Sequence, residues 1–203
     1  MAGDVCEEGL PPDMAVQEAP AMAGSARASL RAEFITEDFR MVGRLDLPPA
    51  QGRLVDILNF CPEPVIVLHD VEAGRLGPES GKVFNWPIVH IRREAIILAI
   101  PHEHRLPTAE VRPRLEYVAK EPHRVSFLLP AFAVVGDLHL AKEVDINAAS
   151  PIRGSDFVPL TDAEATYLPD PTLVWRAAVI IVNVPKAEVC CPGTDLSLSS
   201  FPR

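Results

Sequence analysis

An internal repeat is the feature that most constrains how this chain can fold. Compared with itself at an offset of 93 residues, the sequence has seven identities in the 17 positions from 31 to 47. In the numbering of the first copy, the identical residues are Arg31, Phe34, Phe39, Val42, Gly43, Leu45 and Leu47. Self-similarity at one fixed spacing indicates a structural unit that occurs twice. We therefore expect two copies of one unit, over residues 31–101 and 124–189.

The later parts of the two copies align with small gaps. The aligned segments are residues 55–59 with 144–147, 68–73 with 160–165, and 97–101 with 181–185. On this alignment Trp86 and Trp175, the two tryptophans of the chain, occupy equivalent positions. The repeat therefore predicts that the two copies place aromatic rings at the same point of the fold.

Alternation of apolar and polar residues predicts a half-buried strand near the start of each copy. The apolar face carries Phe39, Met41, Gly43, Leu45 and Leu47 in the first copy, and Phe132, Val134, Gly136, Leu138 and Leu140 in the second. A glycine occupies the same inward position twice. Glycine inside a strand marks a sharp bend or the close approach of another backbone, so we expect one of these at Gly43 and Gly136.

Short elements are expected after this strand. Residues 53–59 place Leu54, Ile57 and Leu58 at helical spacing, which predicts a short helix that ends near Asn59. Further strands are expected over residues 65–72, 83–91 and 95–100, and in the second copy over 157–166, 172–177 and 179–184. The chain has 21 prolines, which favour short elements and loops. The predicted fold class is mainly β, with two tandem small β-barrels of four or five short, bent strands plus a short helix each.

The remaining segments have the composition of connecting chain. Residues 1–30 contain five acidic residues and one arginine, which predicts a disordered acidic N-terminal arm. Residues 102–123 are predicted to be a proline-rich linker and residues 190–203 a C-terminal tail. The first residues lack the basic and apolar regions of a signal peptide, so we expect a cytoplasmic location. No apolar run reaches the roughly 20 residues of a membrane-spanning helix, so no membrane span is expected.

The four cysteines are expected to remain free thiols in a reducing compartment. They are Cys6, Cys61, Cys190 and Cys191, and they form no C-x-x-C pair. Three of them, Cys6, Cys190 and Cys191, lie in the predicted terminal segments, which argues against a shared zinc site. We therefore predict no bound metal and no cofactor.

Two segments resemble the signatures of Sm-like small barrels. Residues 42–72 contain the order Val-Gly-x-Leu, Asp-x-Leu-Asn and Val-Leu-x-Asp-Val-Glu, which resembles the first signature. Residues 89–98 resemble the second, an Ile-Arg-Gly turn between two apolar strands, and residues 175–181 carry a fainter trace of it. The chain is also similar to uncharacterised bacterial domains with an Arg-Leu-x-Asp-x-Leu-Asn element, here residues 53–59.

The resemblance implies a set of ligand-binding residues. In Sm-like proteins the Asp/Asn loop and the Arg-Gly turn hold a nucleobase and its phosphate. The matching positions here are Asp56, Asn59, Arg92 and Arg93 in the first copy, and Asp145, Asn147 and Arg176 in the second. The formal net charge of −9 repels phosphate backbones, which makes nucleic acid a less favoured partner.

Each candidate also has a plain structural interpretation. Aspartate and asparagine hydrogen-bond to local backbone and close turns. Carboxylates two residues apart, at Asp70 and Glu72 and again at Asp162 and Glu164, fit a solvated strand face as well as an acid–base or metal pair. The two tryptophans fit core packing as well as base stacking.

These observations favour binding or assembly over catalysis. The sequence contains no P-loop, dinucleotide fingerprint, nucleophile elbow or zinc-protease motif. We expect a non-enzymatic scaffold or adaptor that pairs through strand edges with a protein partner or with itself. The alternative is an Sm-like RNA-binding protein. A second alternative is a metal-binding protein or enzyme that uses His102 and His104, whose imidazoles would face the same side of an extended segment.

Overall fold

A computed structural model describes residues 29–47, 52–77, 81–102, 119–142, 144, 146 and 155–193. The first half of the described chain contains β1 (Ser29–Ile35), β2 (Phe39–Asp46), α1 (Leu54–Phe60), β3 (Val65–Arg75), β4 (Val83–Arg92), the 3₁₀ turn η1 (Arg93–Ala95) and β5 (Leu98–Pro101). The second half contains β6 (Lys120–Leu129), β7 (Phe132–Ala141), β8 (Phe157–Tyr167), β9 (Val174–Asn183), the 3₁₀ turn η2 (Val184–Lys186) and β10 (Val189–Pro192). The predicted mainly β class is confirmed.

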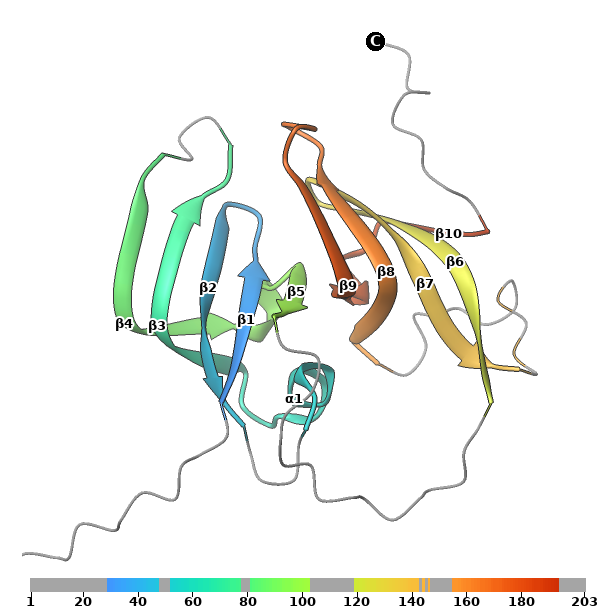
Figure 1. The fold of residues 1–203 in the computed structure, drawn as a ribbon, viewed down its shortest axis with the longest axis horizontal. Helices are drawn as coiled ribbons and strands as arrows, with labels where there is room; N and C mark the ends of the chain where they lie inside the picture. The colour runs from blue at the N-terminus through green and yellow to red at the C-terminus, as the bar shows by residue number, and fades with distance from the viewer. Residues whose placement is uncertain are drawn as a thin grey trace, which may run out of the picture.

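The ten strands of the described residues belong to one antiparallel sheet, in the order β10-β6-β7-β8-β9-β5-β1-β2-β3-β4. We call β5-β1-β2-β3-β4 the first unit and β10-β6-β7-β8-β9 the second unit. Figure 1 shows them on opposite sides of the molecule, with β5 and β9 between them. This order joins the units into one sheet, and it does not show the two separately closed barrels expected from the sequence.

The strands that carry the repeated glycine closely approach their partner strands at that glycine. A Cβ added to Gly43 would lie 2.9 Å from Val71 Cγ2 and 3.2 Å from the His69 carbonyl oxygen. A Cβ added to Gly136 would lie 2.8 Å from the Leu160 Cβ. The pairing of β2 with β3 and of β7 with β8 shifts register at the glycine in both units. The predicted close approach is therefore confirmed in both copies, because only hydrogen fits between the strands.

The partner strand carries a matching irregularity. Asp70 in β3 has φ 50° and Asp162 in β8 has φ 45°, both in the left-handed region. Aspartate is one of the few residues other than glycine that enters this region readily. The same backbone conformation thus recurs at the same place in the two units.

The helix α1 forms where the apolar spacing predicts it. Leu54, Ile57 and Leu58 are buried in the core of the first unit, and the helix ends at Phe60, one residue beyond the predicted stop. The Arg93 guanidinium donates from Nη1 to the Cys61 carbonyl at 2.9 Å and so caps the end of α1. In the second copy the corresponding segment lies mostly outside the described residues.

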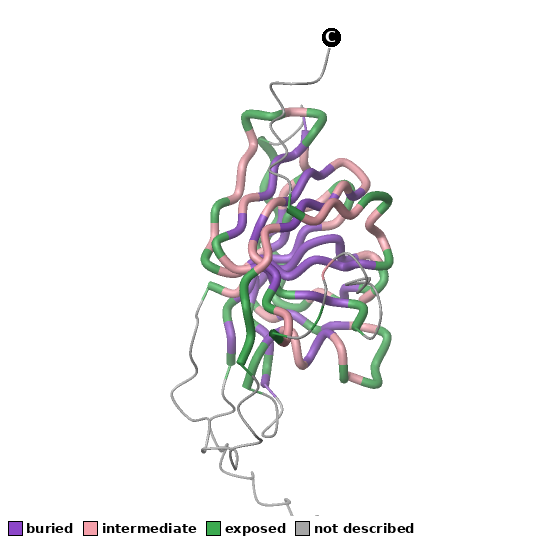
Figure 2. The backbone as a smooth tube through the Cα atoms, turned by 90° about the vertical axis from the view of Figure 1, so that its right-hand side faces the viewer, coloured by how far each residue is buried: buried purple, intermediate pink, exposed green. Residues whose placement is uncertain are grey.

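The two apolar cores cross the boundary between the units. The core of the first unit includes Phe157 and Ile181 from the second. The core of the second includes Ile35 and Leu98 from the first. Figure 2 shows buried backbone running through the middle of the molecule. Each fully buried large side chain contributes about 1.5–3 kcal/mol to stability, so this exchange ties the units together.

The register of the sheet corrects the sequence alignment of the later repeat segments. Ala73 pairs with Phe84, and its counterpart Ala165 pairs with Trp175, so Trp175 is equivalent to Phe84. Trp86 is therefore equivalent to Ala177, and the two tryptophans are not equivalent. The sequence alignment matched identical residues, whereas the register is set by the bulge opposite the glycine.

The ends of the second unit also differ from the prediction. Residues 174–183 form one continuous strand, not the two separate strands expected over 172–177 and 179–184. The counterpart of residues 97–101 is 188–192, because β10 pairs with β6 as β5 pairs with β1. The second unit thus ends at Pro192 and includes residues assigned to the C-terminal tail. Likewise, β6 begins inside the predicted linker and β1 inside the predicted arm.

Within the described residues, no helix is long and apolar enough to cross a membrane.

Candidate functional site: the inner seam and the outer edges

The two units meet through a short ladder between β5 and β9, which we call the inner seam. Leu98 pairs with Val182, and Ala99 pairs with Ile181. Asn183 extends the ladder, because its backbone N–H donates to the Ile97 carbonyl at 3.0 Å and its Nδ2 donates to the Ile96 carbonyl at 2.6 Å. The first unit is therefore joined through its β5 edge, and the second unit through β9, the strand that corresponds to β4.

A buried carboxylate lies beside this seam. The side chain of Glu33 in β1 is 5% exposed. Arg40 donates to it from Nε at 2.6 Å and from Nη2 at 3.1 Å, and the Trp175 indole donates at 2.7 Å. His102 Nε2 lies 3.6 Å from the other carboxylate oxygen. A buried charge is tolerated only when it is paired and hydrogen-bonded, and these donors meet that requirement.

The Glu33 cluster links the two units by a side-chain hydrogen bond. Glu33, Arg40 and His102 belong to the first unit, whereas Trp175 comes from β9 of the second. The hydrogen bond to Glu33 raises the pKa of Arg40, against the opposing effect of partial burial of the guanidinium. Arg40 therefore stays charged. The Trp175 indole N–H donates to the Glu33 carboxylate across the seam and so links the two units.

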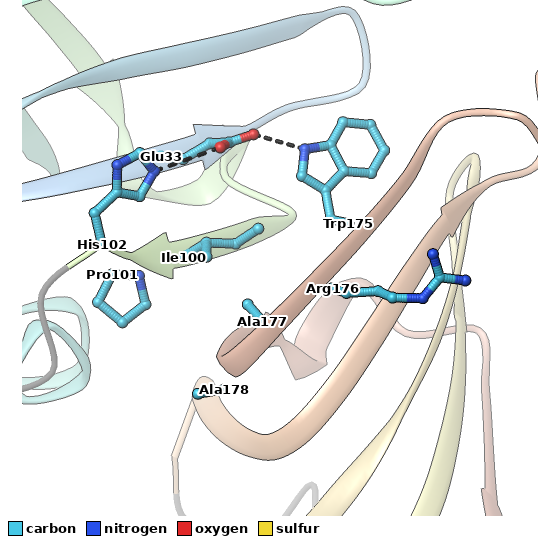
Figure 3. Close-up of a pocket in the computed structure, with 8 residues that line it drawn as sticks. All are labelled: Glu33, Ile100, Pro101, His102, Trp175, Arg176, Ala177 and Ala178. Carbon is cyan, nitrogen blue, oxygen red and sulfur yellow. Dashed lines mark hydrogen bonds and ion pairs between the residues drawn. The ribbon is translucent and has the colours of Figure 1, made fainter.

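A cavity of about 520 Å³ opens next to this cluster. Ile100, Pro101 and His102 line one side, and Trp175, Ala177 and Ala178 line the other. Figure 3 shows the Glu33 carboxylate between His102 and Trp175, with the side chain of Arg176 directed away from it. The cavity exists because β5 stops at Pro101, while β9 continues past it with small alanine side chains.

The two ends of the sheet, β4 and β10, are the outer edges. Val83, Phe84, Trp86 and Ile88 on β4 are 39–56% exposed, and the rings of Phe84 and Trp86 stack with centroids 5.2 Å apart. On β10, Val189 is 41% exposed. Edge strands offer unpaired backbone N–H and C=O groups, and apolar side chains on them favour pairing with another strand.

The site residues implied by the Sm-like resemblance have mainly backbone or surface partners. Asn59 donates from Nδ2 to the Phe157 carbonyl at 2.8 Å and accepts from the Phe157 N–H at 2.9 Å. Arg93 caps α1, as described above. Asp56 lies in the first turn of α1. The structure thus brings Asn59 and Arg93 to the end of one helix, where both bind backbone.

The other predicted residues lie apart from that helix end. Arg92 pairs with Glu94 on the surface, and Arg176, near the start of β9, pairs with Glu164 at 2.7 Å. Arg176 is therefore not in a turn, and the turn of the second unit is η2, where Val184 occupies the position of Arg93. Asp145 and Asn147 lie outside the described residues, as does His104. The described residues contain no group of three or more His, Cys, Asp or Glu side chains arranged for a metal ion.

The other repeated carboxylates lie on strand surfaces. Asp70 pairs with Arg44, and Glu164 pairs with Arg176. Sequence reasoning missed the Glu33 cluster. Glu33 falls on the alternating positions of β1 that also hold Ser29 and Arg31, so the local pattern would place it on the exposed face. Its indole donor is 142 residues away in the sequence.

Comparisons of the chain with protein-family models, with curated protein sequences and with solved structures found no match.

Proposed function

We propose that this protein is a non-enzymatic scaffold whose two units arose by duplication of one Sm-like small barrel, and that it binds protein partners by strand addition at its outer edges. The inner seam carries the proposal. There the chain already joins two units edge to edge, through a backbone ladder and a buried polar cluster.

The duplication is supported by features that chance apolar patterns do not produce together. Both units have the same strand order, a register shift at the glycine and a left-handed aspartate. Both also place a 3₁₀ turn between their last two strands. Within the described residues the strand order ends with β4 on one side and β10 on the other, and an edge strand can take up a further strand.

Side chains on the outer edges support binding there. Val83, Phe84, Trp86 and Ile88 are exposed along β4, so the first unit presents an apolar border. Exposed apolar edges are usually avoided in proteins that stay monomeric, because they recruit other strands. By contrast, the Glu33 carboxylate is buried and hydrogen-bonded, which suits a structural role at the seam.

The test is a pull-down from the native host with tagged protein, with and without nuclease, read by mass spectrometry. Ile88→Lys places a charge on β4, and Phe60→Lys is the matched control because Phe60 is an exposed apolar residue of α1. We expect a stoichiometric protein partner that survives nuclease, persists with Phe60→Lys and is lost with Ile88→Lys. A partner retained equally by both variants would contradict strand addition at β4.

Nuclease treatment separates the scaffold from the RNA-binding alternative. Co-purifying RNA, or partners that vanish with nuclease, would favour an Sm-like RNA interface at Asp56, Asn59, Arg92 and Arg93. In that case Arg92→Ala with Arg93→Ala should weaken RNA binding and reduce its salt dependence.

A further inference from the structure

The cavity beside the Glu33 cluster has the properties of a small-molecule site. We propose that it binds a small neutral molecule with an apolar body and a hydroxyl or amide group, which donates a hydrogen bond to the Glu33 carboxylate. This inference goes beyond the proposed scaffold function and does not depend on it, because the cavity lies at the inner seam and not at the outer edges.

The size and the walls of the cavity suit such a ligand. Its volume of about 520 Å³ lies within the range of roughly 300–1,000 Å³ that is typical of ligand pockets. Ile100 and Pro101 form an apolar wall on one side, and the small side chains of Ala177 and Ala178 form the other. Figure 3 shows the Glu33 carboxylate to one side of these four residues. Ligand pockets combine mostly apolar walls with a few polar groups that orient the ligand in this way.

The Glu33 carboxylate can accept a further hydrogen bond. A carboxylate has about four acceptor positions. Oε1 accepts from Arg40 Nε at 2.6 Å and from Trp175 Nε1 at 2.7 Å, whereas Oε2 accepts from Arg40 Nη2 at 3.1 Å. His102 Nε2 lies 3.6 Å from Oε2, which is beyond hydrogen-bond distance. Among the described residues Oε2 therefore has one donor where Oε1 has two, and a buried acceptor gains from a donor that the ligand supplies.

The imidazole of His102 is a second polar group at this side of the cavity. Its side chain is 35% exposed and lines the cavity next to Glu33. A neutral imidazole has one donor nitrogen and one acceptor nitrogen. A hydroxyl or a primary amide both donates and accepts, so one such ligand group is able to bond to Glu33 and His102 together.

The charges around the cavity favour a neutral ligand. Arg40 already balances the charge of Glu33 through two hydrogen bonds. Arg176 is paired with Glu164, and its side chain is directed away from Glu33 (Figure 3). A ligand anion would lie against the Glu33 carboxylate. A ligand cation would lose its water beside a carboxylate whose charge is already compensated, so neither charged form gains enough to offset its desolvation.

The polar groups and the open space occur together at the inner seam and not at the equivalent positions of the other unit. Trp86 of β4 occupies the place that Ala177 has on β9, so a large ring replaces a small wall. The positions of Glu33, Arg40 and His102 carry, in the second unit, Ser126, Ala133 and Gly193. The repeated backbone alone therefore does not produce the cavity with its carboxylate.

Ligand binding at this place would stabilise the joined state of the two units. Pro101 belongs to the first unit, whereas Ala177 and Ala178 belong to the second, so the ligand contacts both. A molecule that binds the folded protein and not the unfolded chain raises the free energy of unfolding as its concentration rises. The melting temperature is therefore expected to increase with ligand concentration.

The first experiment compares compounds that share one carbon skeleton and differ in their head group. Cyclohexanol and cyclohexanecarboxamide carry neutral donors, cyclohexylammonium is a cation, and cyclohexanecarboxylate is an anion. The chain has two tryptophans, so the Trp86→Phe protein keeps Trp175 as its only indole. We expect the alcohol and the amide to change Trp175 fluorescence saturably, and the two charged compounds to bind more weakly by roughly tenfold or more.

A variant that fills the cavity tests the location. Ala178 is exposed, so Ala178→Leu adds volume to the cavity wall without entering a core. Ala119→Leu is the matched control, because Ala119 is exposed just before β6 and does not line the cavity. In the Trp86→Phe protein, Ala178→Leu should weaken binding of the alcohol by roughly tenfold or more, and Ala119→Leu should leave it unchanged.

A second variant tests the role of the carboxylate. Glu33→Gln keeps the shape of the side chain, but it removes the negative charge that balances Arg40. We expect weaker binding of cyclohexanol and tighter binding of cyclohexanecarboxylate, a reversal that a loss of stability alone would not produce. If Glu33→Gln does not fold, the comparison of Ala178→Leu with Ala119→Leu still decides the location.

Three results would overturn the inference. The first is the absence of saturable binding of both cyclohexanol and cyclohexanecarboxamide. The second is equal binding in Ala178→Leu and Ala119→Leu, which would place the ligand elsewhere on the protein. The third is tighter binding of a charged compound to the Trp86→Phe protein. None of these results bears on strand addition at β4, which the pull-down tests separately.

Discussion

The two units have nearly the same backbone but different chemistry at the strand that faces a neighbour. Both have a close strand approach and a register shift at a glycine, with a left-handed aspartate in the partner strand. Yet the position of Trp175 on β9, where the indole bonds to a buried carboxylate, carries Phe84 on β4. After a duplication, positions that define the strand path are constrained by sterics. The residue types on β4 and β9 differ because the two strands have different neighbours: β9 pairs with β5, whereas β4 is the last strand of the described sheet.

The largest effect is expected in the shared core. Phe34 and Phe127 are equivalent and fully buried, so Phe34→Ala and Phe127→Ala should each lower the free energy of unfolding by about 3–5 kcal/mol. Because each core contains residues of the other unit, both substitutions should shift one common transition. Denaturant unfolding followed by circular dichroism and tryptophan fluorescence checks this. Two separate transitions, of which a variant moves only one, would show that the units unfold independently.

A second comparison concerns the two glycines. Gly136→Ala should lower the free energy of unfolding by about 1–3 kcal/mol, because its new methyl meets the Cβ atoms of Leu160 and Ala163 at 2.8 and 2.9 Å. Gly43→Ala should be milder, since its closest contact is a terminal methyl group of Val71. Thermal unfolding of the two variants in parallel tests the order. Equal losses would mean that Val71 cannot move aside.

A third substitution makes the inner seam resemble the outer edge. Trp175→Phe removes the indole donor to Glu33 and should lower the free energy of unfolding by about 1 kcal/mol. Trp86→Phe is the control, because it keeps an aromatic ring stacked on Phe84 and should change stability by less than about 0.5 kcal/mol. Both are measured at low protein concentration. A larger loss for Trp86→Phe than for Trp175→Phe would show that the indole donor to Glu33 is not the stabilising difference between the two tryptophans.

The smallest effect concerns a group that only the second unit has. Cys190 occupies the place of Ala99, and partial burial, with a further contribution from Cys191, raises the pKa of its thiol. At a given alkaline pH the folded protein therefore holds less Cys190 thiolate than the unfolded chain. Alkylation of Cys190 by iodoacetamide should be slower in the folded protein, with its pH profile displaced upward.

The same pKa shift fixes the sign of its effect on stability. A group whose pKa is raised on folding favours the folded state below its unfolded pKa, and this contribution is lost as the pH rises through the folded value. Cys190→Ala should therefore flatten a shallow decline of stability at alkaline pH. A decline of equal slope in the variant would assign it to other groups.

The sequence predicted the parts of the fold that depend on local pattern. Alternating residues gave the strand that contains Gly43, and apolar spacing gave α1. The alignment failed at Trp175, because identical residues there lie two positions apart in the structure. Joining of the units through β5 and β9 and the bond from Trp175 to Glu33 depend on contacts between distant segments. Such contacts leave no local period in the sequence.

The two hydrogen bonds between the Asn59 side chain and the Phe157 backbone have a consequence for folding rates. They join residues 98 positions apart, at the point where α1 meets the start of β8. Contacts that close so long a loop are entropically costly early in folding, so they form late, after each unit has its own hairpins. A residue whose contacts form after the transition state controls unfolding rather than folding. Asn59 would thus act as a latch that sets the lifetime of the joined state while leaving the speed of its formation nearly unchanged.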